Sequence, residues 1–156
     1  MVYRPQYAYP TPPGYRDEQF HYGFDQSNTP ALNIGNLAAA ALSQNIPLPL
    51  QQDAAFIWRA VTISGINLTD PKVSVRFRDP YGNYLSDDFV LIDLYMRGPG
   101  LAVVGDYCIA LEPAVECPAG AIIWLDIKNT TAGNVNLNLV KLMLFGVKRY
   151  PIGRVA

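Results

Sequence analysis

The sequence predicts an all-β protein: an antiparallel β-sandwich preceded by an extended N-terminal arm. Two observations predict the sandwich, namely short apolar segments that alternate with polar residues and turn signals about every 8–12 residues between them. A third predicts the arm, because the first thirty residues are rich in proline and aromatic residues. With 156 residues, the chain suffices for one domain that buries a core without disulfides or metals. We therefore expect an arm over residues 1–30 and a single sandwich domain over residues 31–156.

Two segments show the alternation of a half-buried antiparallel strand. Residues 72–78 (KVSVRFR) and 121–128 (AIIWLDIK) place apolar and polar side chains on opposite faces. Residues 79–83 (DPYGN) carry turn chemistry, so the chain is expected to reverse after the first of these strands. Six apolar side chains are expected inside the sandwich: Val73, Val75, Phe77, Ile123, Leu125 and Ile127.

Three further segments are predicted to be strands. Residues 56–64 (FIWRAVTIS) are apolar on both faces and rich in β-branched and aromatic residues, and residues 89–95 form another apolar run. Residues 43–50 contain Pro47 and Pro49, which favour an edge strand or a strand-like lead-in because proline donates no hydrogen bond to a neighbour.

The remaining segments are less regular. The longest strand is expected over residues 135–147, with a bulge or burial of both faces near Val140, where the alternation changes phase. The alanine run within residues 33–42 favours one or two helical turns, although Gly35 interrupts it.

The expected arm contains five prolines and seven tyrosine or phenylalanine residues. Proline fixes φ and removes a backbone donor, so the arm should be extended rather than helical or part of a central strand. Aromatic side chains anchor interfaces because they bury large areas with little loss of rotamer entropy. We interpret the arm as a strap that binds a neighbouring subunit; the alternative is that it folds back on its own domain. The expected interface residues are Tyr3, Tyr7, Tyr9, Tyr15, Phe20, Tyr22 and Phe24.

The composition favours assembly. Charged residues make up 16% of the chain, against roughly 25% in an average domain. A surface covered by partners needs less charge than one that keeps a monomer soluble, although a charge-poor monomer is the alternative. The net charge of −1, with scattered Lys and Arg, argues against a nucleic-acid partner. No segment approaches the roughly 20 apolar residues of a membrane helix, and residues 1–13 lack the apolar core of a signal peptide.

Residues typical of catalytic and metal sites are scarce. The single histidine, His21, lies within the expected arm, far in sequence from every candidate nucleophile, and we interpret it as an interface aromatic. Cys108 and Cys117 match no zinc pattern and are expected to be free thiols, with a disulfide as the alternative. Asp87 and Asp88 would point to opposite faces of a strand, so we interpret them as solvated loop residues. We expect a non-enzyme without catalytic residues, metal ligands or a cofactor.

Several stretches together resemble the small β-sandwich proteins of tailed-bacteriophage virions, in particular the head decoration (cement) proteins. They are residues 53–59 (DAAFIWR), 78–86 (RDPYGNYLS), 118–121 (PAGA) leading into 125–129 (LDIKN), and 142–150 (LMLFGVKRY). The resemblance covers about two thirds of the chain and carries over no catalytic residue. It implies a jelly-roll-like sandwich, a homotrimer, that binds the major capsid protein or other virion proteins and is assembled in the cytoplasm of a host bacterium.

The expected function is therefore that of a structural virion protein that stabilises a capsid lattice. A first alternative is a neck or tail component with the same sandwich. A second is a carbohydrate-binding module, which would require exposed, coplanar Trp or Tyr rings for stacking on a sugar, so that the exposure of Trp58 and Trp124 tests it.

Overall fold

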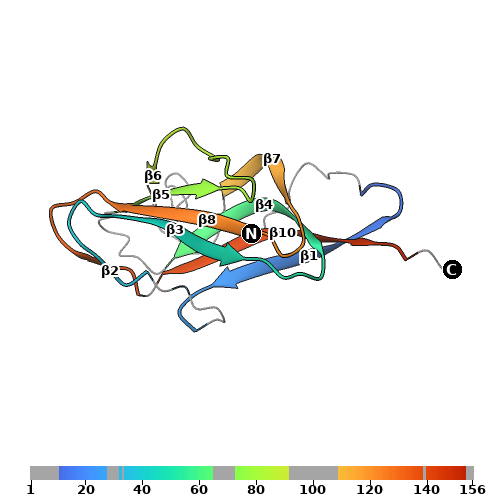
Figure 1. Cartoon of the computed structure of the whole chain (residues 1–156), viewed down its shortest axis with the longest axis horizontal. Helices are drawn as coiled ribbons and strands as arrows, with labels where there is room; N and C mark the ends of the chain where they lie inside the picture. Colours follow the sequence, from blue (N-terminus) through green and yellow to red (C-terminus); the bar gives the residue numbers. More distant parts are fainter. Residues whose placement is uncertain are drawn as a thin grey trace, which may run out of the picture.

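The computed structural model describes residues 11–27, 32, 34–64, 73–91, 109–138 and 140–153. Every paired strand in this part of the chain is antiparallel, and no helix occurs in it, so no helix there could cross a membrane. Two four-stranded sheets pack as a sandwich, and a two-stranded sheet accompanies them (Figure 1). The expected all-β, antiparallel sandwich is confirmed.

The first large sheet has the order β1-β10-β4-β7 and the second has the order β3-β8-β5-β6. The first contains β1 (Tyr15–Phe24), β10 (Lys141–Pro151), β4 (Ala55–Ser64) and β7 (Ile109–Cys117). The second contains β3 (Leu42–Pro49), β8 (Ile122–Asn129), β5 (Val73–Arg78) and β6 (Val90–Leu91). The small sheet pairs β2 (Asn36–Leu37) with β9 (Val135–Asn136).

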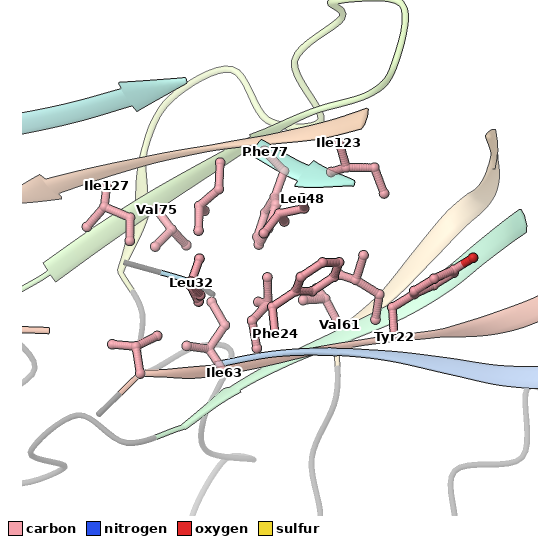
Figure 2. Close-up of a cluster of buried hydrophobic side chains, with 14 of the residues drawn as sticks. Tyr22, Phe24, Leu32, Leu48, Val61, Ile63, Val75, Phe77, Ile123 and Ile127 are labelled. Atoms are coloured by element: carbon pink, nitrogen blue, oxygen red, sulfur yellow. The ribbon is translucent and has the colours of Figure 1, made fainter. Parts of the chain in front are cut away.

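The core lies between the two large sheets, whose inward side chains point toward one another in Figure 2. All six side chains that the alternation assigned to the interior are buried, which confirms the phase of β5 and β8. Opposite them, β4 contributes Phe56, Trp58, Val61 and Ile63, each at most 2% exposed. The expected strand over residues 43–50 is also confirmed as an edge strand, β3, with a register shift between Ser43 and Ile46.

The single long strand expected over residues 135–147 was wrong. The chain forms β9, leaves it, and enters β10 at Lys141 in a different sheet. The side chain of Asn136 accepts a hydrogen bond from the backbone N–H of Asn138 (2.9 Å), a local bond that competes with continued strand pairing. The change of phase near Val140 therefore marks a change of sheet.

Two other expectations need correction or lie partly outside the described residues. Residues 34–41 form β2 and a turn rather than helical turns, because Ala40 has φ of 56°, which a right-handed helix does not allow, and Leu42 begins β3. The run over residues 89–95 contains β6, and residues 92–95 lie outside the described part of the chain.

The segment 15–24, which we assigned to the arm, is β1 of the sandwich and pairs with β10 along its whole length. Prolines flank this segment in the sequence but do not occur within it, so its backbone is free to pair. Of the two expectations for the arm, these residues follow the alternative, in which it folds back on its own domain.

Candidate interaction surface

Strand β1 is tied to β10 by a two-point ion pair. Both oxygens of the Asp17 carboxylate accept hydrogen bonds from the Arg149 guanidinium, from Nε at 2.8 Å and from Nη2 at 2.9 Å. The two residues face each other in the register of the two strands. The bonds from Arg149 lower the pKa of Asp17, and the same bonds raise the pKa of Arg149. This pairing fixes the register of β1 on its sheet.

A second set of contacts, which we call the Lys148 cluster, lies on the other face of β1. The Lys148 ammonium donates to both carboxylate oxygens of Asp53 (2.9 and 2.8 Å) and also to the Gln51 side chain. It lies 3.9 Å from the centre of the Phe20 ring, and the Lys148 side chain is only 3% exposed. The bond from Lys148 lowers the pKa of Asp53. A buried cation is thus satisfied by a carboxylate, an amide and an aromatic face.

The aromatic residues expected at an interface divide into three groups. Tyr22 and Phe24 are 6% exposed and belong to the core, so their expected role as contacts to another subunit was wrong. Phe20 is half-buried under Lys148, whereas Tyr15 is 45% exposed. The remaining three residues lie outside the described part of the chain: Tyr3, Tyr7 and Tyr9.

The alternation of β1 was a signal that the sequence reasoning missed. Phe20, Tyr22 and Phe24 occupy every second position, with polar residues between them, which is the pattern of a half-buried strand. The ion pairs of the surface had no local signal in the sequence. Arg149 lies 132 residues from its partner Asp17, and Lys148 lies 95 residues from its partner Asp53.

A cleft of about 520 Å³ lies where β1 begins and β10 ends. At this place the N–H of Ile152 donates to the carbonyl of Gly14 (2.8 Å), and both Tyr15 and Ile152 are exposed. The cleft is lined by Thr11, Tyr15, Arg16, Asp17, Pro151, Ile152 and Gly153. It offers a partner two apolar side chains beside charged groups at the start of β1.

A cation-aromatic stack lies on the second sheet. Since Val75 and Phe77 face the core, Arg76 and Arg78 face outward on β5. The Arg76 guanidinium lies 3.6 Å from the centre of the Tyr84 ring and also donates to backbone carbonyls of the loop that carries this tyrosine. Tyr84 is 47% exposed and Tyr81 of the same loop is 69% exposed. The Tyr84 ring is held in place by Arg76 yet open to solvent, as a contact residue of an interface would be.

The tryptophans do not form the sugar platform that the second alternative required. Trp58 is fully buried, packs on Phe77 with ring centres 5.5 Å apart, and donates its ring N–H to the carbonyl of Ala60 (2.9 Å). Trp124 is half-buried on β8. A ring inside the core cannot stack on a sugar, so the carbohydrate-binding alternative loses one of the two tryptophans that test it.

The groups considered for chemistry are dispersed. His21 is exposed on β1 and packs against the Phe145 ring. Asp87 and Asp88 are exposed in a loop, as expected. Cys117 is a buried free thiol whose pKa is raised to about 12, chiefly by burial, while Cys108 lies outside the described residues. Within the described ranges, no three His, Cys, Asp or Glu residues gather as metal ligands would.

Comparison of the chain with models of known protein families and with curated protein sequences gave no match.

Proposed function

We propose that the protein is a non-enzymatic structural component of a tailed-phage particle, which assembles with copies of itself and binds the capsid lattice as a decoration protein. The observation that supports this most is the order of the strands. Counted along the chain, the eight strands of the two large sheets lie as 1-8-3-6 and 2-7-4-5. This is the order that we expect of a jelly roll, an architecture frequent in viral capsids. It therefore agrees with the resemblance found in the sequence.

The surface gives a second line of support. Few charged residues are present for a chain of this size, and tyrosines such as Tyr15, Tyr81 and Tyr84 are exposed. Exposed tyrosine favours contact with protein, because its ring buries apolar area while its hydroxyl still finds a polar partner. At about 25 cal/mol per Å² of apolar surface, even a small contact would strengthen a shell when it is repeated at every symmetric junction. A shell that holds DNA under pressure would benefit from such contacts.

The proposed partners are the major capsid protein or other virion proteins, and the proposed state is a homo-oligomer, a trimer by resemblance. A neck or tail component with the same fold is the alternative. The two proposals differ in copy number, since a decoration protein covers the whole lattice and a neck protein forms a single ring.

Heating of purified particles tests the proposed function. Particles produced without this protein should release their DNA at a lower temperature than wild-type particles, because the coat junctions lose a bridging contact. Addition of the purified protein should restore the original release temperature, whereas the same amount of an unrelated β-sandwich protein should not. If particles with and without this protein release their DNA at the same temperature, the decoration role is contradicted.

A further inference from the structure

We propose that the loop joining β5 to β6, residues 79–89, docks on the capsid lattice with Tyr81 as its anchor. Its partner is a surface of the major capsid protein that offers an apolar pocket rimmed by lysine or arginine side chains. This inference rests on the proposed function and names the contact through which that function acts. The loop stands out from the sandwich at the top of Figure 1.

Tyr81 is the most exposed of the large hydrophobic side chains that the structure describes, at 69%. Among the described residues, its side chain has no ring contact, cation contact or hydrogen-bond partner. A tyrosine ring buries a large apolar area and has few rotatable bonds, which is why tyrosine is frequent among the residues that dominate binding. Burial of this ring in a pocket would therefore contribute most of the contact.

The backbone that carries Tyr81 is already ordered. Asp79, which is 9% exposed, accepts hydrogen bonds from the backbone N–H groups of Tyr81 (2.9 Å) and Asn83 (2.8 Å), and from the Asn83 side-chain amide (3.0 Å). The N–H of Gly82 closes the turn on the carbonyl of Asp79 (3.0 Å), and Pro80 fixes one backbone angle within it. A loop that is ordered before binding loses little conformational entropy in the contact, so more of the gain from burying Tyr81 appears as affinity.

The second half of the loop is fixed to β5. Arg76 donates to the carbonyls of Ser86 (3.1 Å) and Asp87 (2.8 Å). Its guanidinium also lies 3.6 Å from the centre of the Tyr84 ring, which is 47% exposed. The loop thus presents two exposed tyrosines on one ordered backbone.

The charge of the loop indicates the kind of partner. Asp87 and Asp88 are exposed, and neither forms an ion pair with another described residue. Residues 79–89 contain no Lys, Arg or His, and Arg78 at the base of the loop is already paired with Asp126 (3.2 Å). An acidic loop is repelled by nucleic acid and attracted by basic side chains. The partner that fits is therefore a protein pocket that receives the tyrosine ring and whose basic rim faces the two carboxylates.

The test measures the affinity of purified variants for phage particles that lack this protein. Tyr81→Ala should weaken binding by about tenfold or more, whereas Tyr81→Phe, which keeps the ring, should bind within about twofold of the wild type. Met143→Ala is the matched control, because Met143 is an exposed apolar residue (39%) of the other large sheet, and its affinity should be unchanged. Thermal unfolding of each variant shows that it is folded.

Two further changes separate the charge and the order of the loop from the ring. The double variant Asp87→Asn, Asp88→Asn should bind more weakly at low salt and should lose the decrease of affinity with salt that the wild type shows. Asp79→Ala should weaken binding although both tyrosines remain. Asp79→Asn keeps an acceptor oxygen for the two backbone N–H groups, so it should bind nearly as the wild type does.

Hydroxyl-radical footprinting gives a readout without any substitution. The Tyr81 ring should be oxidised in the free protein and protected on the particle, whereas oxidation of Met143 should be the same in both. If the wild type binds and Tyr81→Ala and the double variant bind equally well, the loop is not the contact, and the proposed function stands without it. If the wild type does not bind the particles at all, the proposed function and the docking of the loop are both contradicted.

Discussion

Gly146 lies on β10 opposite Trp58 of β4, at the register shift between Phe145 and Gly146. A methyl group at this position would overlap the carbonyl oxygen of Ile57 and lie 2.8 Å from the ring of Phe56. Both neighbours belong to the buried part of the sheet, so neither has room to move. The absence of a side chain therefore allows the two central strands to pack.

We predict that Gly146→Ala lowers the free energy of unfolding by about 1–3 kcal/mol, the usual cost of overpacking a core. Urea unfolding of the purified variant measures the change. Gly133→Ala is the matched control, because nothing lies within 4 Å of the added methyl group, and its stability should stay near that of the wild type. Equal stability of the two variants would show that the close approach at Gly146 does not constrain the fold.

The Asp17–Arg149 pair predicts a dependence of stability on pH. The pKa of Asp17 is lowered in the folded state by the bonds from Arg149, so the folded chain binds this proton less readily than the unfolded chain. The stabilisation is thus present above the ordinary value of 3.8 and is lost as the pH falls through the lowered folded pKa. Asp17→Asn should cost on the order of 1 kcal/mol or less near pH 7.

The difference in the free energy of unfolding between wild type and Asp17→Asn should therefore shrink below about pH 4, where the carboxyl of the unfolded chain also takes up its proton. Thermal unfolding over a pH series measures it. Glu18→Gln is the control: its carboxylate is 52% exposed and pairs with an exposed Arg16, so its effect should be small at every pH. A difference for Asp17→Asn that does not change with pH would mean that the ion pair contributes nothing.

At the scale of elements, β1 is the strand whose role the sequence reasoning misjudged. Its prolines suggested an extended arm, but they flank residues 15–24 rather than interrupt them. Strands β5 and β8 were predictable because their apolar periodicity reports local geometry, and β4 was predictable because β-branched and aromatic residues favour strands. Which strand is the neighbour of β1, and which residue neutralises Lys148, depends on contacts about a hundred residues apart in the sequence, for which a single sequence carries no local signal.

Two truncations separate the strand from the residues before it. From the sequence alone, we would expect the sandwich to fold without residues 1–30. The structure predicts instead that removal of residues 1–24 exposes the edge of β10 and takes Tyr22 and Phe24 from the core, with a large loss of stability. Removal of residues 1–10 should leave the unfolding midpoint nearly unchanged, since these residues precede β1. Circular dichroism during heating measures the unfolding midpoint of each truncated chain. A stable fold without β1 would contradict the assignment of β1 to the core.

At the scale of the whole molecule, the sandwich and its inward residues follow from periodicity, whereas the candidate contact surfaces do not. The cleft beside Tyr15 and the Arg76–Tyr84 stack arise where loops and strand ends meet in space. The division of residues 135–147 between two sheets has the same origin, because the chain changes sheet where local asparagine bonding ends one strand. The molecule thus combines a predictable core with a surface that only the folded structure defines.

The central claim is that the protein covers a phage capsid lattice, and its copy number in purified particles tests this most directly. Quantitative mass spectrometry of the particles, with isotope-labelled peptides of this protein and of the major capsid protein, gives the ratio of the two. We predict a ratio that is a simple fraction of the coat protein, as repeated binding across the lattice requires. Absence of the protein from the particles would contradict the account, and a copy number that fits a single ring would place it at the neck or tail instead.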